Sequence, residues 1–111
     1  MKSFDLAGLA ATQGGEYTLG ARDLHSQACY LVYGILKSGE SGRLIRPGSG
    51  YEEILCAVSG PLVILSSRGE ERLEMGHALH VKEDESFSIA NPSDFSVVYI
   101  LAGGRSDPPA S

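Results

Sequence analysis

Short apolar runs alternate with turn residues through the centre of the chain, from residue 51 to residue 91. The runs have the length of β-strands, and turn signals separate them, such as Ser-Gly-Pro at 59–61 and Asn-Pro at 91–92. Strand-length runs bounded by Gly, Pro, Asn and Ser at close spacing are typical of antiparallel β-structure. The pattern therefore predicts an all-β barrel or sandwich of antiparallel strands, with little or no helix.

Further strands are predicted on both sides of this centre. Residues 27–36 are rich in β-forming side chains and predict a well-buried strand. Residues 70–75 alternate weakly, which fits an edge strand with a charged outer face. The predicted strands cover residues 16–19, 27–36, 43–45, 53–58, 62–65, 70–75, 87–90 and 95–102, with another apolar run after Gly76.

The same pattern divides the chain into three parts. Residues 1–15 are expected to form a partly ordered arm, and residues 16–102 the barrel. Residues 103–111 are expected to be a disordered tail, because this segment has no large apolar side chains to bury. The sequence contains no long amphipathic helix pattern, no internal repeat and no sign of a second domain.

Composition and charge narrow the classes of function. A chain of 111 residues suffices for one domain with a modest core. The net charge of −5 argues against a nucleic-acid surface, which needs clustered Lys and Arg. No apolar run reaches the roughly 18 residues of a membrane span, and Asp5 interrupts the weakly apolar N-terminus, so we predict a cytoplasmic protein. Cys29 and Cys56 lie in apolar strand patterns and are expected to be buried free thiols.

Two spaced residue pairs carry a family resemblance. Gly60 follows Glu53 after six residues, and Gly76 and Asn91 stand at the two ends of a second segment. These pairs resemble the ends of the two motifs of the cupins, a family of double-stranded β-helix, or jelly-roll, barrels. The order of strands and turns also fits, so the resemblance covers residues 16–102 and implies a small single-domain cupin barrel.

The resemblance also implies a metal site, whose ligands are largely replaced here. Cupins typically hold a metal with two His and one Glu of the first motif and one His of the second. Glu53 stands at the position of the Glu, and Phe87 replaces the second-motif His. The two first-motif His positions fall, in alternative registers, on Gly48 and Gly50 or on Leu44 and Arg46. One carboxylate does not hold a transition metal, so no metal and no other cofactor is predicted.

The chain has three histidines outside these positions: His25, His77 and His80. His77 and His80 are three residues apart, which on a strand places them on opposite faces, so both cannot point into one barrel. We interpret all three as surface or locally hydrogen-bonded imidazoles. An inward-facing His25 or His80 beside Glu53 would instead favour a metal-dependent cupin.

A barrel of this size can hold a small ligand at its mouth. The candidate pocket consists of Arg46, Tyr51 and Glu53, with Phe87 as an apolar wall. Arg46 would pair with an anionic group, and Glu53 would accept hydrogen bonds from hydroxyls. The alternative is a packed interior in which Glu53 pairs with a neighbouring arginine. The strand tyrosines are interpreted as core or interface residues: Tyr30, Tyr33 and Tyr99.

Three classes of function remain open. The favoured class is a non-catalytic small-molecule-binding, regulatory or structural module, and the resemblance implies a homodimer in which residues 27–36 supply an interface. The second is a metal-independent sugar epimerase or isomerase, whose acid and base would be Glu53 and Tyr51. The third, a metal-dependent dioxygenase or isomerase, is disfavoured by the missing ligands. No nucleic-acid or membrane partner is predicted.

Overall fold

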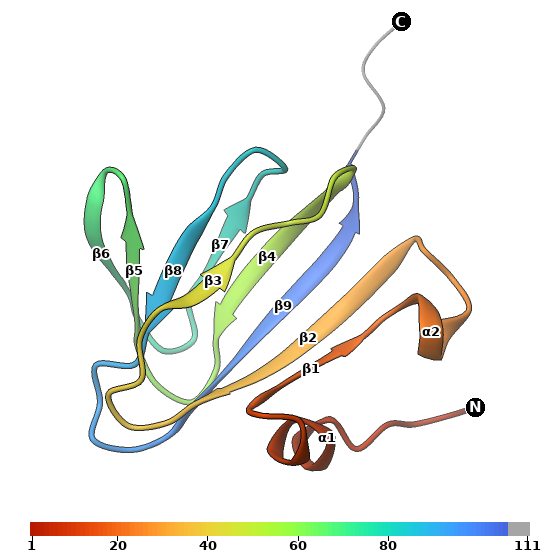
Figure 1. Ribbon diagram of the computed structural model, residues 1–111, viewed down its shortest axis with the longest axis horizontal. Coiled ribbons are helices and arrows are strands. Elements are labelled where there is room, and N and C mark those ends of the chain that lie inside the picture. The colour runs from red at the N-terminus through yellow and green to blue at the C-terminus, as the bar shows by residue number, and fades with distance from the viewer. Residues whose placement is uncertain (107–111) are drawn as a thin grey trace, which may run out of the picture.

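The computed structural model describes residues 1–106, which form two β-sheets and two short helices (Figure 1). The antiparallel all-β fold with little helix is confirmed. The elements in chain order are α1 (Leu6–Thr12), β1 (Glu16–Leu19), α2 (Ala21–Leu24), β2 (Cys29–Leu36), β3 (Arg43–Ile45), β4 (Tyr51–Ala57), β5 (Leu62–Ser66), β6 (Gly69–Leu73), β7 (Ala78–Val81), β8 (Phe87–Ala90) and β9 (Val97–Arg105).

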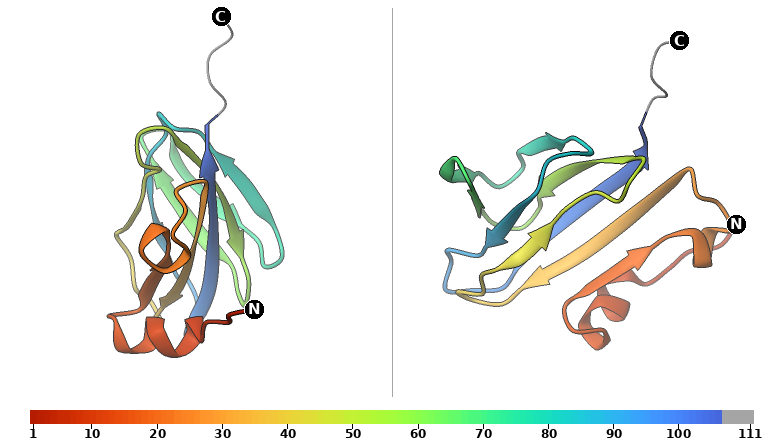
Figure 2. Two further views of the ribbon diagram at one scale, coloured as in Figure 1. Left: turned by 90° about the vertical axis from the view of Figure 1, so that its right-hand side faces the viewer. Right: turned by 45° about the horizontal axis from the view of Figure 1, so that its top comes forward.

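The strands form two antiparallel layers that face each other (Figure 2). One sheet has the order β1-β2-β9-β4-β7, and the other has the order β3-β8-β5-β6. From β2 onward the chain passes back and forth between the sheets, so that strands far apart in sequence become neighbours. β9, for example, lies between β2 and β4. This winding gives the barrel its interior.

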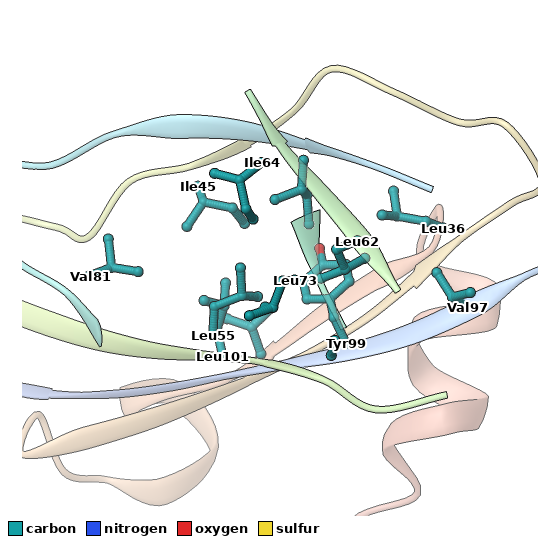
Figure 3. Close-up of a cluster of buried hydrophobic side chains, with 13 residues drawn as sticks. Leu36, Ile45, Leu55, Leu62, Ile64, Leu73, Val81, Val97, Tyr99 and Leu101 are labelled. Atoms are coloured by element: carbon teal, nitrogen blue, oxygen red, sulfur yellow. The ribbon is translucent and has the colours of Figure 1, made fainter. Parts of the chain in front are cut away.

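The core lies between the two sheets, because each strand alternates inward apolar residues with outward ones. In β4, Leu55 and Ala57 are fully buried. Ile54, which lies between Glu53 and Leu55 in the sequence, is 51% exposed because it points outward. Figure 3 shows core side chains of the two sheets pointing toward one another. The buried cluster consists of Val32, Leu36, Ile45, Leu55, Ala57, Leu62, Ile64, Leu73, Val81, Ile89, Val97, Tyr99 and Leu101.

The N-terminal arm contains a helix that the strand pattern did not predict. Asp5 caps α1, since its carboxylate accepts a hydrogen bond from the backbone N–H of Gly8 at 3.1 Å. Ala10 is completely buried, and α1 packs against β1 and β2. With seven residues the helix is too short to reveal a clear period in the sequence. Neither helix of the described residues is long and apolar enough to cross a membrane.

The last strand extends beyond the apolar residues from which it was predicted. β9 runs to Arg105, so residues 103–105 belong to the sheet rather than to the predicted tail, and Gly103 and Gly104 pair with both β2 and β4. The strand continues because its two neighbours supply hydrogen-bond partners where the sequence has no apolar side chains. Residues 107–111 of the predicted tail lie outside the described residues.

The edge strand is confirmed, whereas the cysteine prediction is wrong in part. β6 lies at the edge of its sheet, and its first four residues are exposed. Cys29 is exposed, because it begins β2 on the outward side, and Cys56 is half-buried on the outer face of β4. Both thiols are free.

Asn91 ties three backbone segments together at the end of β8. The side chain is 2% exposed, and its Nδ2 donates to the carbonyls of Leu36 at 3.2 Å, Lys37 at 3.0 Å and Phe95 at 2.6 Å. Its Oδ1 accepts from the backbone N–H of Ser93 at 2.8 Å. The residue at the end of the second motif therefore has a structural role.

Candidate functional site

A cavity of about 200 Å³ lies between the sheets, with walls from β1, β2, β3, β4 and β9. Its lining combines apolar side chains with carboxylates, hydroxyls and one guanidinium. Arg46 and Thr18 are exposed at the rim, whereas Glu53 is only 5% exposed. The lining residues are Glu16, Thr18, Tyr30, Val32, Leu44, Ile45, Arg46, Glu53 and Leu101.

Tyr30 and Glu53 meet across a glycine. In the sheet register Gly103 of β9 pairs with Tyr30 on one side and with Glu53 on the other, so the three residues form one row on the inner face. A Cβ on Gly103 would lie 2.1 Å from Cζ of Tyr30, which means that the ring occupies the space above the glycine. The Tyr30 hydroxyl thereby reaches Glu53 and donates a hydrogen bond to its Oε2.

A second row of three residues on the inner face also consists of a glutamate, a glycine and a tyrosine, on β1, β2 and β9. Gly34 of β2 pairs with Glu16 on one side and with Tyr99 on the other. The Tyr99 ring lies over Gly34, where a Cβ would be 2.0 Å from Cζ, and its hydroxyl donates to Glu16. Arg43 supports this row, since its Nη1 donates to the Tyr99 hydroxyl at 3.3 Å. The two rows place both carboxylates in the wall of one cavity.

Glu53 has one unused oxygen. Its Oε2 accepts from Tyr30, but its Oε1 is buried and has no hydrogen-bond partner. Burial raises the pKa of Glu53 above its ordinary value, and the negative charge of Glu16 raises it further, whereas the hydrogen bond from Tyr30 lowers it. Burial and the bond to the carboxylate raise the pKa of Tyr30 in turn. A buried acceptor without a partner is a natural place for a ligand donor.

The structure brings together two of the four predicted pocket residues. Arg46 and Glu53 line the same cavity. The hydroxyl of Tyr51 donates instead to the carbonyl of Gln27 at 2.6 Å, and the Tyr51 ring packs edge-on against Tyr30 with ring centres 5.4 Å apart. Phe87 packs against the hydrophobic core and borders another depression. Glu53 pairs with Tyr30 rather than with an arginine.

The donors around this cavity do not fit a transition metal. Glu53 and Glu16 are the only Asp, Glu, His or Cys residues in its lining. All three histidines are exposed, and His80 lies on the outer face, 2.6 Å from the carboxylate of Glu52. Within residues 1–106, no group of three or more His, Cys, Asp or Glu side chains is arranged to hold a metal ion.

Sequence reasoning missed Glu16, Thr18 and Tyr30 as lining residues. Alternation along β2 does place Tyr30 on the same face as Val32, which was the available signal. The sequence could not reveal that β1, β2 and β4 contribute to one cavity, because β9 from the end of the chain lies between β2 and β4.

Comparison with known proteins agrees with this architecture. No protein-family model and no curated protein sequence matches the chain. Among solved structures, a cupin protein from Bacteroides fragilis has a TM-score of 0.71 and 16% identity, covering 100% of this chain and 86% of that chain. The Cupin_2 domain of an XRE family transcriptional regulator from Enterobacter cloacae has a TM-score of 0.67 and 17% identity, with 83% and 96% covered.

A third neighbour is a sugar phosphate isomerase of the cupin superfamily from Silicibacter pomeroyi. It has a TM-score of 0.64 and 20% identity, covering 88% of this chain and 64% of that chain. Identities this low establish the fold alone. The chain therefore has the cupin fold, a double-stranded β-helix barrel, and its neighbours include both enzymes and regulatory domains.

Proposed function

We propose that this cupin-fold chain is a binding module for a small hydroxylated molecule that carries an anionic group. The observation that carries the proposal is the buried, unpartnered Oε1 of Glu53 in the cavity wall. Leaving such an acceptor without a partner costs about 1–3 kcal/mol, which a ligand hydroxyl would offset.

The other residues of the lining and the cavity volume restrict the charge and the size of the ligand. Arg46 is exposed at the rim and is the only cationic side chain in the lining, so it would receive a carboxylate or phosphate. The cavity of about 200 Å³ is smaller than typical drug-sized sites of roughly 300–1,000 Å³. A monosaccharide derivative or a small hydroxy acid has the matching size and chemistry. The cytoplasm is the proposed location.

The test is binding measured by calorimetry with four probes: gluconate, lactate, glucose 6-phosphate and the neutral sugar glucose. We expect Glu53→Gln to weaken binding of every probe that binds by ten- to hundredfold, the usual worth of a hydrogen bond to a charged group. Arg46→Ala should weaken the anionic probes and leave glucose unchanged. Glu52→Gln is the matched control, because Glu52 is the adjacent residue on the outward side of β4.

The proposal is wrong if none of these probes binds, or if a probe binds with the same affinity to wild type and to Glu53→Gln. Regulatory domains among the structural neighbours, such as that of the Enterobacter cloacae regulator, support a binding role without catalysis.

A second candidate is a metal-independent isomerase or epimerase. The observation in its favour is the Tyr30–Glu53 pair, a hydroxyl and a carboxyl in contact inside the cavity. The sugar phosphate isomerase among the neighbours supports the same candidate. Proton exchange distinguishes the two: an isomerase would exchange a carbon-bound proton of glucose 6-phosphate with deuterated water, and Glu53→Gln would abolish the exchange. A binding module would leave the probe unlabelled.

A further inference from the structure

A groove of about 320 Å³ lies beside the cavity, at the end of the barrel where β2 and β4 begin and β9 ends. In the sheet register Gly104 of β9 pairs with Cys29 of β2 and with Glu52 of β4, so these three strand ends lie next to one another (Figure 1). The short helix α2 and the loop before β4 supply further walls of the groove, through Ala21 and Gly48.

The groove and the cavity share two lining residues, Thr18 and Tyr30. Tyr30 belongs to both because its hydroxyl binds Glu53 in the cavity wall, while its ring packs edge-on against the ring of Tyr51 in the groove. Thr18 is exposed at the rim of both spaces. A ligand that binds in the cavity can therefore extend into the groove.

The two spaces differ in their chemistry. The cavity wall carries two carboxylates and the guanidinium of Arg46. Among residues 1–106, by contrast, no charged side chain lines the groove. Its lining consists of two aromatic rings, from Tyr30 and Tyr51, and of small or uncharged polar residues. Aromatic walls without charged groups favour an apolar part of a ligand.

The ring of Tyr51 is held in place but is not covered. Its hydroxyl donates to the carbonyl of Gln27 at 2.6 Å, the ring centre of Tyr30 is 5.4 Å away, and the Arg105 guanidinium lies 5.9 Å from the ring centre. Tyr51 is nevertheless only half-buried, and Gly48 leaves space beside it, since a Cβ there would meet its nearest atom, Cδ2 of Tyr51, at 3.9 Å. A fixed ring with free surface is suited to packing against another aromatic ring.

We propose that the ligand carries an aromatic ring that binds in the groove against Tyr51, while its hydroxyls and its anionic group occupy the cavity. This inference rests on the function proposed above and narrows the ligand to an aryl derivative of an anionic sugar. With about 320 Å³ added to the cavity of about 200 Å³, the site reaches the range of roughly 300–1,000 Å³ that is typical of small-molecule sites.

The positions of the binding groups match an aryl glycoside that is phosphorylated at its 6-position. Glu53 is buried, whereas Arg46 and Gly48 are exposed at the rim, two positions apart in the chain. In a pyranose ring, the anomeric position and the 6-position lie on either side of the ring oxygen, and the other hydroxyls lie on the opposite edge. Hydroxyls directed at Glu53 therefore leave both the phosphate and the aryl group at the rim, where Arg46 and the groove would receive them.

The experiment is calorimetry with the full chain, comparing phenyl glucoside 6-phosphate with methyl glucoside 6-phosphate. We expect the phenyl compound to bind about tenfold more tightly, because its ring is buried against aromatic walls. Gly48→Leu should bring the affinities of the two compounds to within about twofold of each other, since the new side chain fills the space beside Tyr51. The backbone of Gly48 lies outside the left-handed region, so it accepts a side chain without strain.

Two further variants separate the groove from its surroundings. Ser49→Leu is the matched control, because Ser49 is exposed in the same loop and lines neither space, and it should keep the tenfold preference. Tyr51→Phe keeps the ring and loses only the bond to Gln27, so it should also keep the preference, whereas Tyr51→Leu should lose it. Loss of the preference in Ser49→Leu, or its retention in Gly48→Leu, would overturn the proposal.

The outcomes distinguish this inference from the function on which it rests. Equal affinities of wild type for the phenyl and methyl compounds would overturn the aromatic site and leave the proposed binding function intact. If neither compound binds, the proposed function is wrong, and phenol alone at millimolar concentration then tests the groove. Phenol should shift the NMR signals of the Tyr51 ring in wild type but not in Gly48→Leu, and unchanged signals in wild type would overturn the aromatic site as well.

Discussion

Tyr30 and Gly103 face each other across β2 and β9, and the tyrosine ring lies over the glycine. The absence of a side chain at Gly103 lets the Tyr30 hydroxyl reach Glu53 on the strand beyond. The same relationship between Tyr99 and Gly34 brings the other hydroxyl to Glu16. Both contacts that shape the cavity thus depend on a glycine in the middle of a sheet, where glycine otherwise weakens a strand.

We first predict that Gly103→Ala destabilises the fold by about 1–3 kcal/mol, the usual cost of overpacking. The new methyl group would stand 2.1 Å from Cζ of Tyr30 and would push the ring away from Glu53. Urea unfolding measures the change. Gly104→Ala is the control, because a Cβ there meets its nearest atom, the carbonyl oxygen of Ala28, at 3.9 Å. Equal stabilities of the two variants would contradict this account.

The second prediction concerns the hydroxyl of Tyr30. Tyr30→Phe removes the donor to Glu53 and leaves both oxygens of a buried carboxyl without a partner, which should cost about 1–3 kcal/mol. Tyr33→Phe, on the outer face of the same strand, should change the free energy of unfolding little. If Tyr30→Phe costs as much in a Glu53→Leu background, which lacks an acceptor, as in wild type, the hydroxyl does not act through Glu53.

The third prediction is a pH dependence of stability. Because burial raises the pKa of Glu53 in the folded state, protonation of this side chain stabilises the fold relative to the unfolded chain. Its contribution to stability is complete below the unfolded-state pKa of about 4.3 and is lost as pH rises through the higher folded-state value. Each tenfold difference in proton affinity between the two states is worth about 1.4 kcal/mol.

Glu53→Gln cannot lose a proton, so its stability relative to wild type should rise as the pH increases above the unfolded-state pKa of about 4.3. Urea unfolding at several pH values measures the difference, and Glu70→Gln, at an exposed position of β6, serves as the control. Parallel pH profiles for wild type and Glu53→Gln would show that the folded state does not raise this pKa.

The fourth prediction concerns Asn91. Asn91→Ala leaves the carbonyls of Leu36, Lys37 and Phe95 without their buried donor, so we expect a loss of about 3 kcal/mol or more. Asn91→Asp keeps the acceptor for Ser93 but removes the donor, and it should be destabilised similarly. Thermal unfolding is the measurement. A variant Asn91→Asp as stable as wild type would assign the main role to the bond with Ser93.

The local pattern of apolar and turn residues was sufficient to predict most strands of this protein. Turn residues and short apolar runs are local features of the sequence. The predicted strands therefore coincide with the observed β1, β3 and β8, and the predictions for β4 and β5 agree except at their ends. Glu53, singled out by its spacing from Gly60, lies in the wall of the cavity. The pattern did not predict helix α1, because its seven residues show no clear helical period.

Only the tertiary structure decided which side chains meet. Tyr30, Gly103 and Glu53 come from three separate parts of the chain, and they form a row only because β9 inserts between β2 and β4. Tyr51 shares a strand with Glu53 but points to Gln27 instead of into the cavity. Strand pairing over such distances depends on how the whole core packs, so the sequence by itself determined the strands and their inner faces, while the fold determined the site.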